Sequence, residues 1–285
     1  MAQILSGKEV ASAINAGVKA EAAGLRERGI VPKLAIIRVG EREDDISYER
    51  GAIKRCGSVG VEVKSIVLPS DTSQDELISV IHDVNNDSGI HGVLLFRPLP
   101  KHIDDNAVRR ALLPEKDVDG ITDGSMAGIY AGEDIGFPPC TPQACMEILD
   151  HYGIDVKGKR AVVIGRSLVV GKPAAMMLLK RHATVTICHT RTVDLPSVAR
   201  EAEILIVSAG KAGIIGADYL NENQIVIDVG INVNEDGKLC GDVDFKSAEP
   251  VVKAITPVPG GVGTVTTSVL AKHVVKAAAR SIEDI

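Results

Sequence analysis

The chain has 285 residues, of which 45% are hydrophobic and 25% charged, and this composition suits one large or two small globular domains. Its formal net charge of −6 argues against nucleic acid as the main partner, and no apolar run is long enough to predict a membrane span. The N-terminus lacks the apolar core of a signal peptide, and the five cysteines show no C-x-x-C spacing. The sequence therefore predicts a cytoplasmic protein with no disulfide framework and no metal site.

Short apolar runs bounded by glycine or polar residues alternate with helical patterns along most of the chain. In the first half, strands are predicted at 33–39, 61–67 and 92–96, with helices near 45–59 and 73–85 between them. In the second half, strands are predicted at 160–164, 184–188, 204–208 and 225–229. This alternation predicts an α/β fold in which parallel strands are covered by helices on both faces.

The best internal boundary is residues 136–142, where three prolines exclude a helix interior or a central strand. Thr141 and Pro142 fit the N-cap and the first turn of a helix that leads from an N-terminal lobe to a second lobe. A last helix, 266–279, is expected to return to the first lobe. The predicted domains are residues 1–139 with 266–285, and residues 140–265. A cleft between two such lobes is a common place for a ligand.

Residues 160–173 combine a buried strand, a loop that contains Gly165 and Gly171, and a helix that starts near Pro173. Backbone N–H groups at a glycine turn and at a helix N-terminus suit a pyrophosphate. The spacing is not G-x-G-x-x-G, so the pattern fits either a dinucleotide site or a plain turn between strand and helix.

The strand predicted at 184–188 is followed by Thr190 and Arg191. In NAD sites an acidic residue in this region usually binds the ribose hydroxyls, whereas a basic residue can bind the 2′-phosphate of NADP. Arg166 and Arg191 are available here, and the nearest carboxylate, Asp194, lies further along the chain. The pattern favours NADP, with NAD as the alternative cofactor. The competing interpretation is that both arginines are solvated surface charges.

Residues 255–263 contain two prolines and three glycines, a composition that lets the main chain approach a flat ligand closely. Taken alone, the run is more typical of an ordinary Pro-Gly turn. It stands, however, in a series of seven short motifs. These are Pro-Leu-Pro at 98–100, Lys-Asp-Val-Asp-Gly at 116–120, Pro-Cys-Thr-Pro at 139–142, Gly-Arg-Ser-x-x-Val-Gly-x-Pro at 165–173, Val-Ile-Asp-Val-Gly-Ile-Asn at 226–232, Gly-Asp-Val at 241–243 and Thr-Pro-Val-Pro-Gly-Gly-Val-Gly at 256–263.

With these motifs in this order, essentially the whole chain resembles the methylenetetrahydrofolate dehydrogenase/cyclohydrolase family (FolD type). The resemblance implies a homodimer of two-lobed chains, with a Rossmann-type NADP domain in the C-terminal lobe and a tetrahydrofolate derivative in the cleft. The implied reaction, in one-carbon metabolism and purine biosynthesis, is oxidation of methylene- to methenyl-tetrahydrofolate by hydride transfer. Many members of the family then hydrolyse the product to formyl-tetrahydrofolate.

The resemblance also implies roles for individual residues. Asp119 matches the aspartate that anchors the pterin, and Tyr48 matches a tyrosine that orients the reacting centre. Pro257, Gly260 and Gly261 match the segment that lines the folate and nicotinamide cleft. Cofactor contacts are implied for Gly165, Arg166, Ser167, Gly171, Pro173, Thr190, Arg191 and Ile231. By composition alone, Asp119 could equally be a turn residue and Tyr48 a residue at the edge of a core.

The chain departs from the family in the first lobe. The family helix carries Ser-x-x-Tyr-x-x-x-Lys, but here Asp45 and Ala52 occupy the serine and lysine positions, and Phe96 replaces the glutamine that supports the lysine. Lys54 points far round the helix from Tyr48, and Arg55 cannot act as a neutral base. Hydrolysis needs proton movement that these replacements do not provide, whereas hydride transfer needs mainly alignment.

We therefore predict an NADP-dependent methylenetetrahydrofolate dehydrogenase with weak or absent cyclohydrolase activity, whose product passes to a separate cyclohydrolase. One alternative is a bifunctional enzyme with a rearranged hydrolytic site. Another is a catalytically dead protein that binds folate or nucleotide. An amino-acid or hydroxy-acid dehydrogenase of similar plan is a third, but the sequence shows no dedicated Lys-Asp pair for it.

Overall fold

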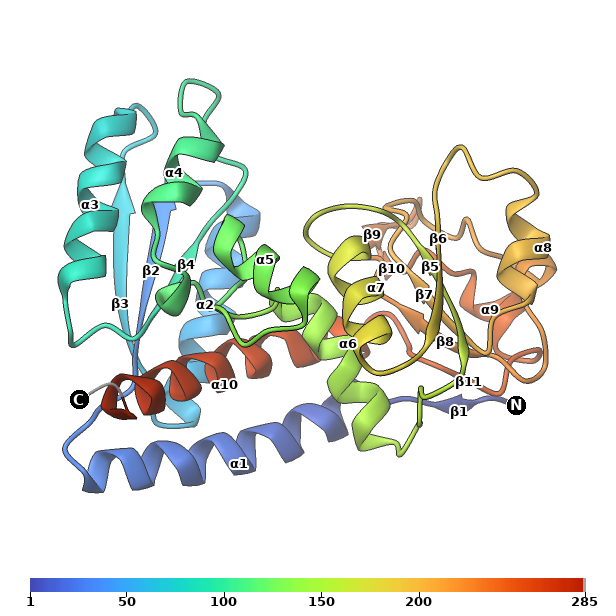
Figure 1. Cartoon of the computed structure of the whole chain (residues 1–285). Helices are drawn as coiled ribbons and strands as arrows, with labels where there is room; N and C mark the ends of the chain where they lie inside the picture. The colour runs from blue at the N-terminus through green and yellow to red at the C-terminus, as the bar shows by residue number, and fades with distance from the viewer. Residues whose placement is uncertain (284–285) are drawn as a thin grey trace. The chain divides into compact units, whose positions relative to one another are not determined.

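The structure, a computed structural model, describes residues 1–283 and contains two compact units. The first unit contains Met1–Ser12 and Thr141–Thr266; the second contains Ala13–Cys140 and the chain from Thr267 onward. Each unit has its own parallel sheet packed between helices (Figure 1). The α/β fold that the sequence predicts is therefore confirmed, and it is described below one unit at a time.

The second unit is built on a three-stranded parallel sheet of order β3-β2-β4. Its strands are β2 (Lys33–Val39), β3 (Glu62–Leu68) and β4 (Gly92–Leu95). Its helices are α2 (Glu43–Ser58), α3 (Gln74–Asn86), α4 (Asp105–Ala111), the 3-10 helix η1 (Pro114–Lys116), α5 (Asp123–Ala131) and most of α1 (Gly7–Glu27) and α10 (Val262–Glu283). Apolar side chains of β2 and β4 pack on α3 and α4 at one face. A Cβ built on Gly92 would meet Val274, so α10 lies at the opposite face.

The first unit is built on a six-stranded sheet of order β1-β11-β8-β7-β5-β6, in which every pair is parallel. Its strands are β1 (Gln3–Ile4), β5 (Arg160–Ile164), β6 (Thr184–Cys188), β7 (Ile204–Val207), β8 (Ile225–Asp228) and β11 (Ala254–Ile255). A separate antiparallel hairpin joins β9 (Asn232–Val233) to β10 (Leu239–Cys240). Its helical segments are α6 (Cys140–His151), α7 (Gly171–Lys180), α8 (Leu195–Arg200), η2 (Ala217–Tyr219) and α9 (Phe245–Ala248).

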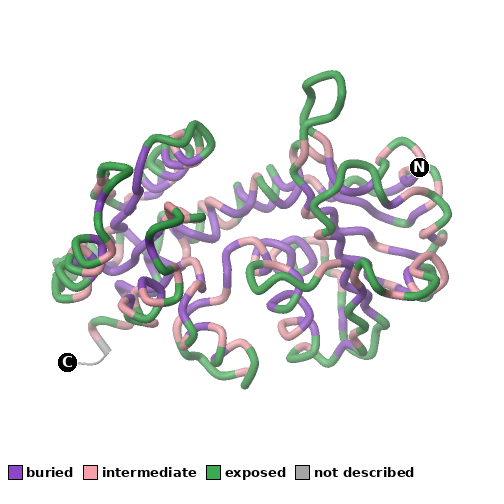
Figure 2. Tube along the Cα trace, turned by 90° about the horizontal axis from the view of Figure 1, so that it is seen from above, coloured by how far each residue is buried: buried purple, intermediate pink, exposed green. Residues whose placement is uncertain are grey.

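Aliphatic side chains fill the interior of this unit, as expected for a chain without tryptophan. Val162, Leu205 and Val226 stand side by side in register on β5, β7 and β8, and each is buried. They belong to a core that includes Ala199 of α8 and Ala248 of α9. Figure 2 shows these buried segments in purple beneath exposed helices and loops in green. Among the described helices, none combines the length and the apolar character needed to cross a membrane.

Three boundaries differ from the sequence prediction. The first twelve residues belong to the unit with the larger sheet, because β1 pairs in parallel with β11 at the sheet edge. Helix α6 begins at Cys140, so Thr141 lies inside it rather than at its N-cap. Helix α10 begins at Val262, four residues before the predicted start at Thr266, because the glycine-rich run continues directly into helical backbone.

Candidate functional site

Asp119 lies in a tight turn after η1 that is held in shape by the neighbouring Asp117. The fully buried carboxylate of Asp117 accepts hydrogen bonds at 2.7 to 3.0 Å from Ile121 N, Thr122 N and Ser125 Oγ. Gly120 has φ +66°, and a Cβ at this position would lie 2.4 Å from Pro139 N. The turn therefore requires glycine there, and it fixes the direction in which Asp119 leaves the main chain.

The carboxyl group of Asp119 is less fully bonded than that of Asp117. It accepts a long hydrogen bond from Cys140 N at 3.4 Å. Burial, the largest effect, raises the pKa of Asp119 to about 6; Asp117 also raises it, whereas the Cys140 hydrogen bonds and the charge of Arg97 lower it. Near neutral pH the group is an ionised acceptor with oxygen lone pairs available to a ligand.

Tyr48 lies on α2, and its phenol belongs to the same cluster. Burial raises the pKa of Tyr48 well above its usual value of 10.0, and the nearby Cys140, Asp119 and Cys56 raise it further. The ring of Phe96 meets the ring of Tyr48 edge to face, with centroids 5.8 Å apart and an interplanar angle of 83°. The two residues to which the sequence assigns substrate contacts, Tyr48 and Asp119, thus lie together.

The position four residues after Tyr48 on α2 is filled by a methyl group. Ala52 has no exposed surface, whereas Lys54 is exposed. The same helix is fastened to β2 by Glu49, whose carboxylate accepts a hydrogen bond at 2.9 Å from the buried guanidinium of Arg38. One turn after Tyr48, this face of α2 therefore carries the methyl group of an alanine, and Lys54 does not place its ammonium group there.

In the other unit, the loop between β5 and α7 is closed by two glycines. A Cβ on Gly171 would lie 2.2 Å from Gly165 O, and a Cβ on Gly165 would lie 2.4 Å from Ser208 O. Ser167 caps the loop internally by accepting a hydrogen bond from Val170 N at 3.1 Å. The N-terminus of α7 has no side-chain cap, although Lys172 N donates to Ser167 O at 3.0 Å, and the positive end of the helix dipole suits a phosphate. Pro173 is buried in the first turn of α7, where it needs no N–H partner.

Two exposed arginines lie close to this loop along the chain or across the sheet. Arg166 is in the loop itself, and Arg191 follows β6, which pairs with β5 in parallel register. The turn that carries Arg191 and Thr190 is fixed because Arg191 N donates to His189 Nδ1 at 3.0 Å and Thr192 N donates to His189 O at 2.9 Å. Both turns therefore stand at the carboxyl edge of the sheet, where nucleotides bind in doubly wound folds.

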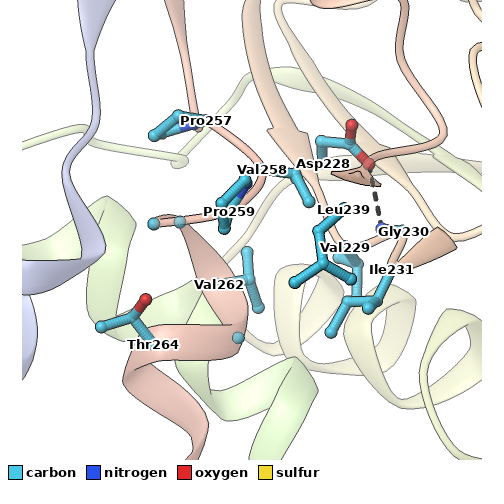
Figure 3. A pocket seen from close by; sticks show the side chains of 13 residues that line it. Asp228, Val229, Gly230, Ile231, Leu239, Pro257, Val258, Pro259, Val262 and Thr264 are labelled. Atoms are coloured by element: carbon cyan, nitrogen blue, oxygen red, sulfur yellow. Dashed lines mark hydrogen bonds between the residues drawn. The ribbon is translucent and has the colours of Figure 1, made fainter. Parts of the chain in front are cut away.

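A pocket of about 230 Å³ lies beside the Pro-Gly run of the same unit. Figure 3 shows its lining: Asp228, Val229, Gly230, Ile231, Leu239, Pro257, Val258, Pro259, Gly260, Gly261, Val262, Gly263 and Thr264. The Val258–Pro259 bond is cis, and Gly260 has φ +105°. Most of these side chains are apolar or absent, a lining suited to a flat aromatic ring. One pocket thus contains Ile231, for which the resemblance implies a cofactor contact, and the cleft segment of Pro257, Gly260 and Gly261.

The buried carboxylates that hold these turns are not predicted from the sequence. Asp117 shares a motif with Asp119, and Asp242 stands in the Gly-Asp-Val motif, but neither position is predicted to bond to the main chain. The sequence shows only that Asp117 lies two residues before Asp119 and that Asp242 follows a glycine. Only the contacts separate a carboxylate that shapes a turn from one that faces a ligand.

Comparison with known families assigns almost the whole chain. Residues 5–119 match the catalytic domain of tetrahydrofolate dehydrogenase/cyclohydrolase, and residues 139–282 match its NAD(P)-binding domain. The Bifunctional protein FolD of Carboxydothermus hydrogenoformans is 53% identical over 279 residues, which cover 97% of each chain. That of Alkaliphilus oremlandii is 50% identical over 277 residues, with 97% of each chain covered.

Solved structures agree. The bifunctional FolD enzyme of Campylobacter jejuni has a TM-score of 0.96 at 38% identity and covers 98% of this chain and 99% of its own. The FolD enzyme of Trypanosoma brucei, complexed with NADP and an inhibitor, has a TM-score of 0.92 at 34% identity, with 99% of this chain and 98% of its own covered. Two domain models in the expected order, together with relatives of this identity and coverage, establish that the chain belongs to the tetrahydrofolate dehydrogenase/cyclohydrolase family.

Proposed function

We propose that this protein oxidises methylene-tetrahydrofolate to methenyl-tetrahydrofolate with NADP, and that it hydrolyses the product weakly or not at all. The observation that carries the proposal is that Tyr48 lies near enough to Asp119 for the carboxylate to raise the pKa of the phenol, on a helix where the buried methyl group of Ala52 stands at the position of the family lysine. The residues suited to substrate positioning are present, whereas the lysine suited to hydrolysis is replaced.

The two polar groups serve binding and orientation. The carboxylate of Asp119 accepts hydrogen bonds from the amino-pyrimidine edge of the pterin, and the ring of Tyr48 packs against the folate. NADP, when bound, supplies the hydride acceptor. The loop of Gly165 and Gly171 and the first turn of α7 receive its pyrophosphate, and the pocket lined by Ile231 and Gly260 receives its nicotinamide.

Hydrolysis requires a group that activates water and moves protons. The phenol of Tyr48 stays protonated at ordinary pH because its pKa is raised well above 10.0. Ala52 has no group that can exchange a proton, and Phe96, whose ring meets that of Tyr48 edge to face, replaces the glutamine that the resemblance implies as the support of the lysine. We therefore propose that a separate cyclohydrolase consumes the methenyl product.

Two assays on the purified chain test the proposal. With methylene-tetrahydrofolate and NADP, we expect reduced nicotinamide to form at an enzyme-dependent rate, and with methenyl-tetrahydrofolate we expect decay close to the buffer rate. Absence of reduced nicotinamide with both NADP and NAD would instead support a catalytically dead binding protein. Rapid enzyme-dependent decay that Tyr48→Phe abolishes would support a bifunctional enzyme with a rearranged site.

Cofactor choice gives a separate prediction. Replacing Arg166 and Arg191 together with alanine is expected to raise the Kd for NADP about 10- to 100-fold and to change the Kd for NAD little, because only NADP carries the 2′-phosphate. Isothermal titration of both cofactors measures this difference. Equal losses for the two would remove the arginines from 2′-phosphate recognition.

We also propose that the enzyme is a homodimer, and the support for this is the family resemblance. A solution mass near twice the chain mass of 30.0 kDa, measured by light scattering, is expected. A mass of one chain would contradict the dimer without affecting the proposed reaction.

A further inference from the structure

Asp242 is a fully buried carboxylate just after β10, and its role goes beyond the sites described above. Its Oδ2 atom accepts hydrogen bonds from Ala209 N at 2.6 Å and Gly210 N at 2.9 Å. Its Oδ1 atom accepts from Lys211 N at 2.9 Å and from Asn232 Nδ2 at 2.9 Å. Three consecutive backbone N–H groups and one side-chain amide converge on this one side chain, so it fixes the backbone around it.

Asp242 joins the loop after β7 to the start of the hairpin after β8, which follows directly on Ile231 of the pocket in Figure 3. Residues 209–211 follow β7, and Asn232 opens the hairpin that follows β8. The carboxylate packs directly behind the pocket wall, because a Cβ on Gly230 would lie 2.4 Å from Asp242 Cγ. Asp242 does not itself line the pocket, so it acts on the pocket through the main chain.

A second carboxylate completes the arrangement. Asp228, at the end of β8, accepts hydrogen bonds from Gly230 N at 2.9 Å, Asp242 N at 3.1 Å and Val243 N at 3.0 Å. A Cβ on Gly241 would lie 1.8 Å from Asp228 Oδ2, so the main chain can come this close to Asp228 only because residue 241 is glycine. Two buried carboxyl groups, Asp228 and Asp242, therefore hold the main chain around Gly230 in the pocket wall.

We propose that Asp242 is a positioning residue for the nicotinamide end of the dinucleotide, and this inference rests on the proposed NADP-dependent function. The wall that it holds is largely apolar, and the pocket is lined by the chain that follows the carboxyl ends of β8 and β11. The loop of Gly165 and the arginines, which suit the pyrophosphate and the 2′-phosphate, make none of the four bonds to Asp242. Ser208, which precedes Ala209, packs on Gly165 of that loop but makes none of these four bonds, so loss of Asp242 is expected to affect the nicotinamide end of the cofactor more than the other end.

The test compares two probes by isothermal titration: NADP, and adenosine 2′,5′-bisphosphate, which lacks nicotinamide. In Asp242→Asn one acceptor oxygen becomes a donor that faces backbone N–H groups. We expect the Kd for NADP to rise about 10- to 100-fold and the Kd for the bisphosphate to stay within about threefold. The control is Asp244→Asn, since Asp244 is exposed and its side chain does not cap α9; both Kd values should stay at wild type.

The outcomes separate the hypotheses. Unchanged NADP binding in Asp242→Asn, or an equal loss for both probes, overturns the positioning role. Should Asp242→Asn fail to fold, Asn232→Ala decides, because it removes one of the four bonds and is expected to show a smaller loss confined to NADP. Failure of the wild-type chain to bind either NADP or NAD would overturn the proposed function and, with it, the role of Asp242.

Discussion

Replacing Asp119 with asparagine is expected to lower kcat/KM for methylene-tetrahydrofolate by about 10²- to 10⁴-fold. One acceptor oxygen would become a donor that faces the donors of the pterin edge, and the remaining bond would lose its charge; a hydrogen bond to a charged group is worth about 1.5–3 kcal/mol, and an unpaired donor adds a further cost. The rate of nicotinamide reduction, measured over a range of folate concentrations, gives this ratio. The Kd for NADP is expected to stay unchanged, because Asp119 belongs to the unit that does not carry the nucleotide loop.

Asp117→Asn is the matched control for this prediction. It removes a carboxylate that holds the turn through three hydrogen bonds, so it is expected to lower Tm more than Asp119→Asn does. A thermal melt of both variants distinguishes the two roles. If Asp119→Asn kept wild-type kcat/KM, Asp119 would be a turn residue and would have no role in binding the pterin.

The same carboxyl group sets the expected pH dependence. Burial raises the pKa of Asp119 to about 6, so protons bind to it as the pH falls through that value. Because only the ionised form accepts both hydrogen bonds, kcat/KM for the folate should fall below about pH 6, and the fall should be absent in Asp119→Asn. A flat profile across this range in the wild type would exclude Asp119 as the titrating anchor.

The double variant Ala52→Lys with Phe96→Gln is expected to raise the hydrolysis of methenyl-tetrahydrofolate by about 10²-fold or more, the usual contribution of a positioned acid or base. Lysine at position 52 places an amine one helical turn from Tyr48, and glutamine at position 96 supplies a hydrogen-bonding partner in place of the phenyl ring. Decay of the methenyl absorbance above the buffer rate measures the gain.

The single variants test the mechanism behind this gain. Ala52→Lys alone puts an ammonium at a position with no exposed surface, so it is expected to lower Tm with little hydrolysis. Phe96→Gln alone adds an amide without a base and should leave hydrolysis near the buffer rate. If the double variant folded with the dehydrogenase intact and still failed to hydrolyse, the two replacements would not explain the missing activity.

The sequence by itself determined the order of seven strands, β2 to β8, because periodicity and turn residues are local properties. Strand β5, with its glycine loop and the helix that follows it, is predicted almost to the residue, since a buried parallel strand reads as an unbroken apolar run. The replacements at Ala52 and Phe96 are also read directly from the sequence, because they are differences in residue type. The pairing of Tyr48 with Asp119 came from family motifs rather than from spacing.

The tertiary structure decided what depends on contacts between distant segments. The two residues of β1 carry too little pattern to be predicted, yet their pairing with β11 assigns the N-terminus to the larger sheet. The sequence likewise gives no sign that Asp117 and Asp242 accept three and four hydrogen bonds, most of them from backbone N–H groups, while Asp119 accepts a long one from Cys140 N. A carboxylate's role depends on which N–H groups the fold brings to it, and those groups come from chain segments whose approach no local pattern specifies.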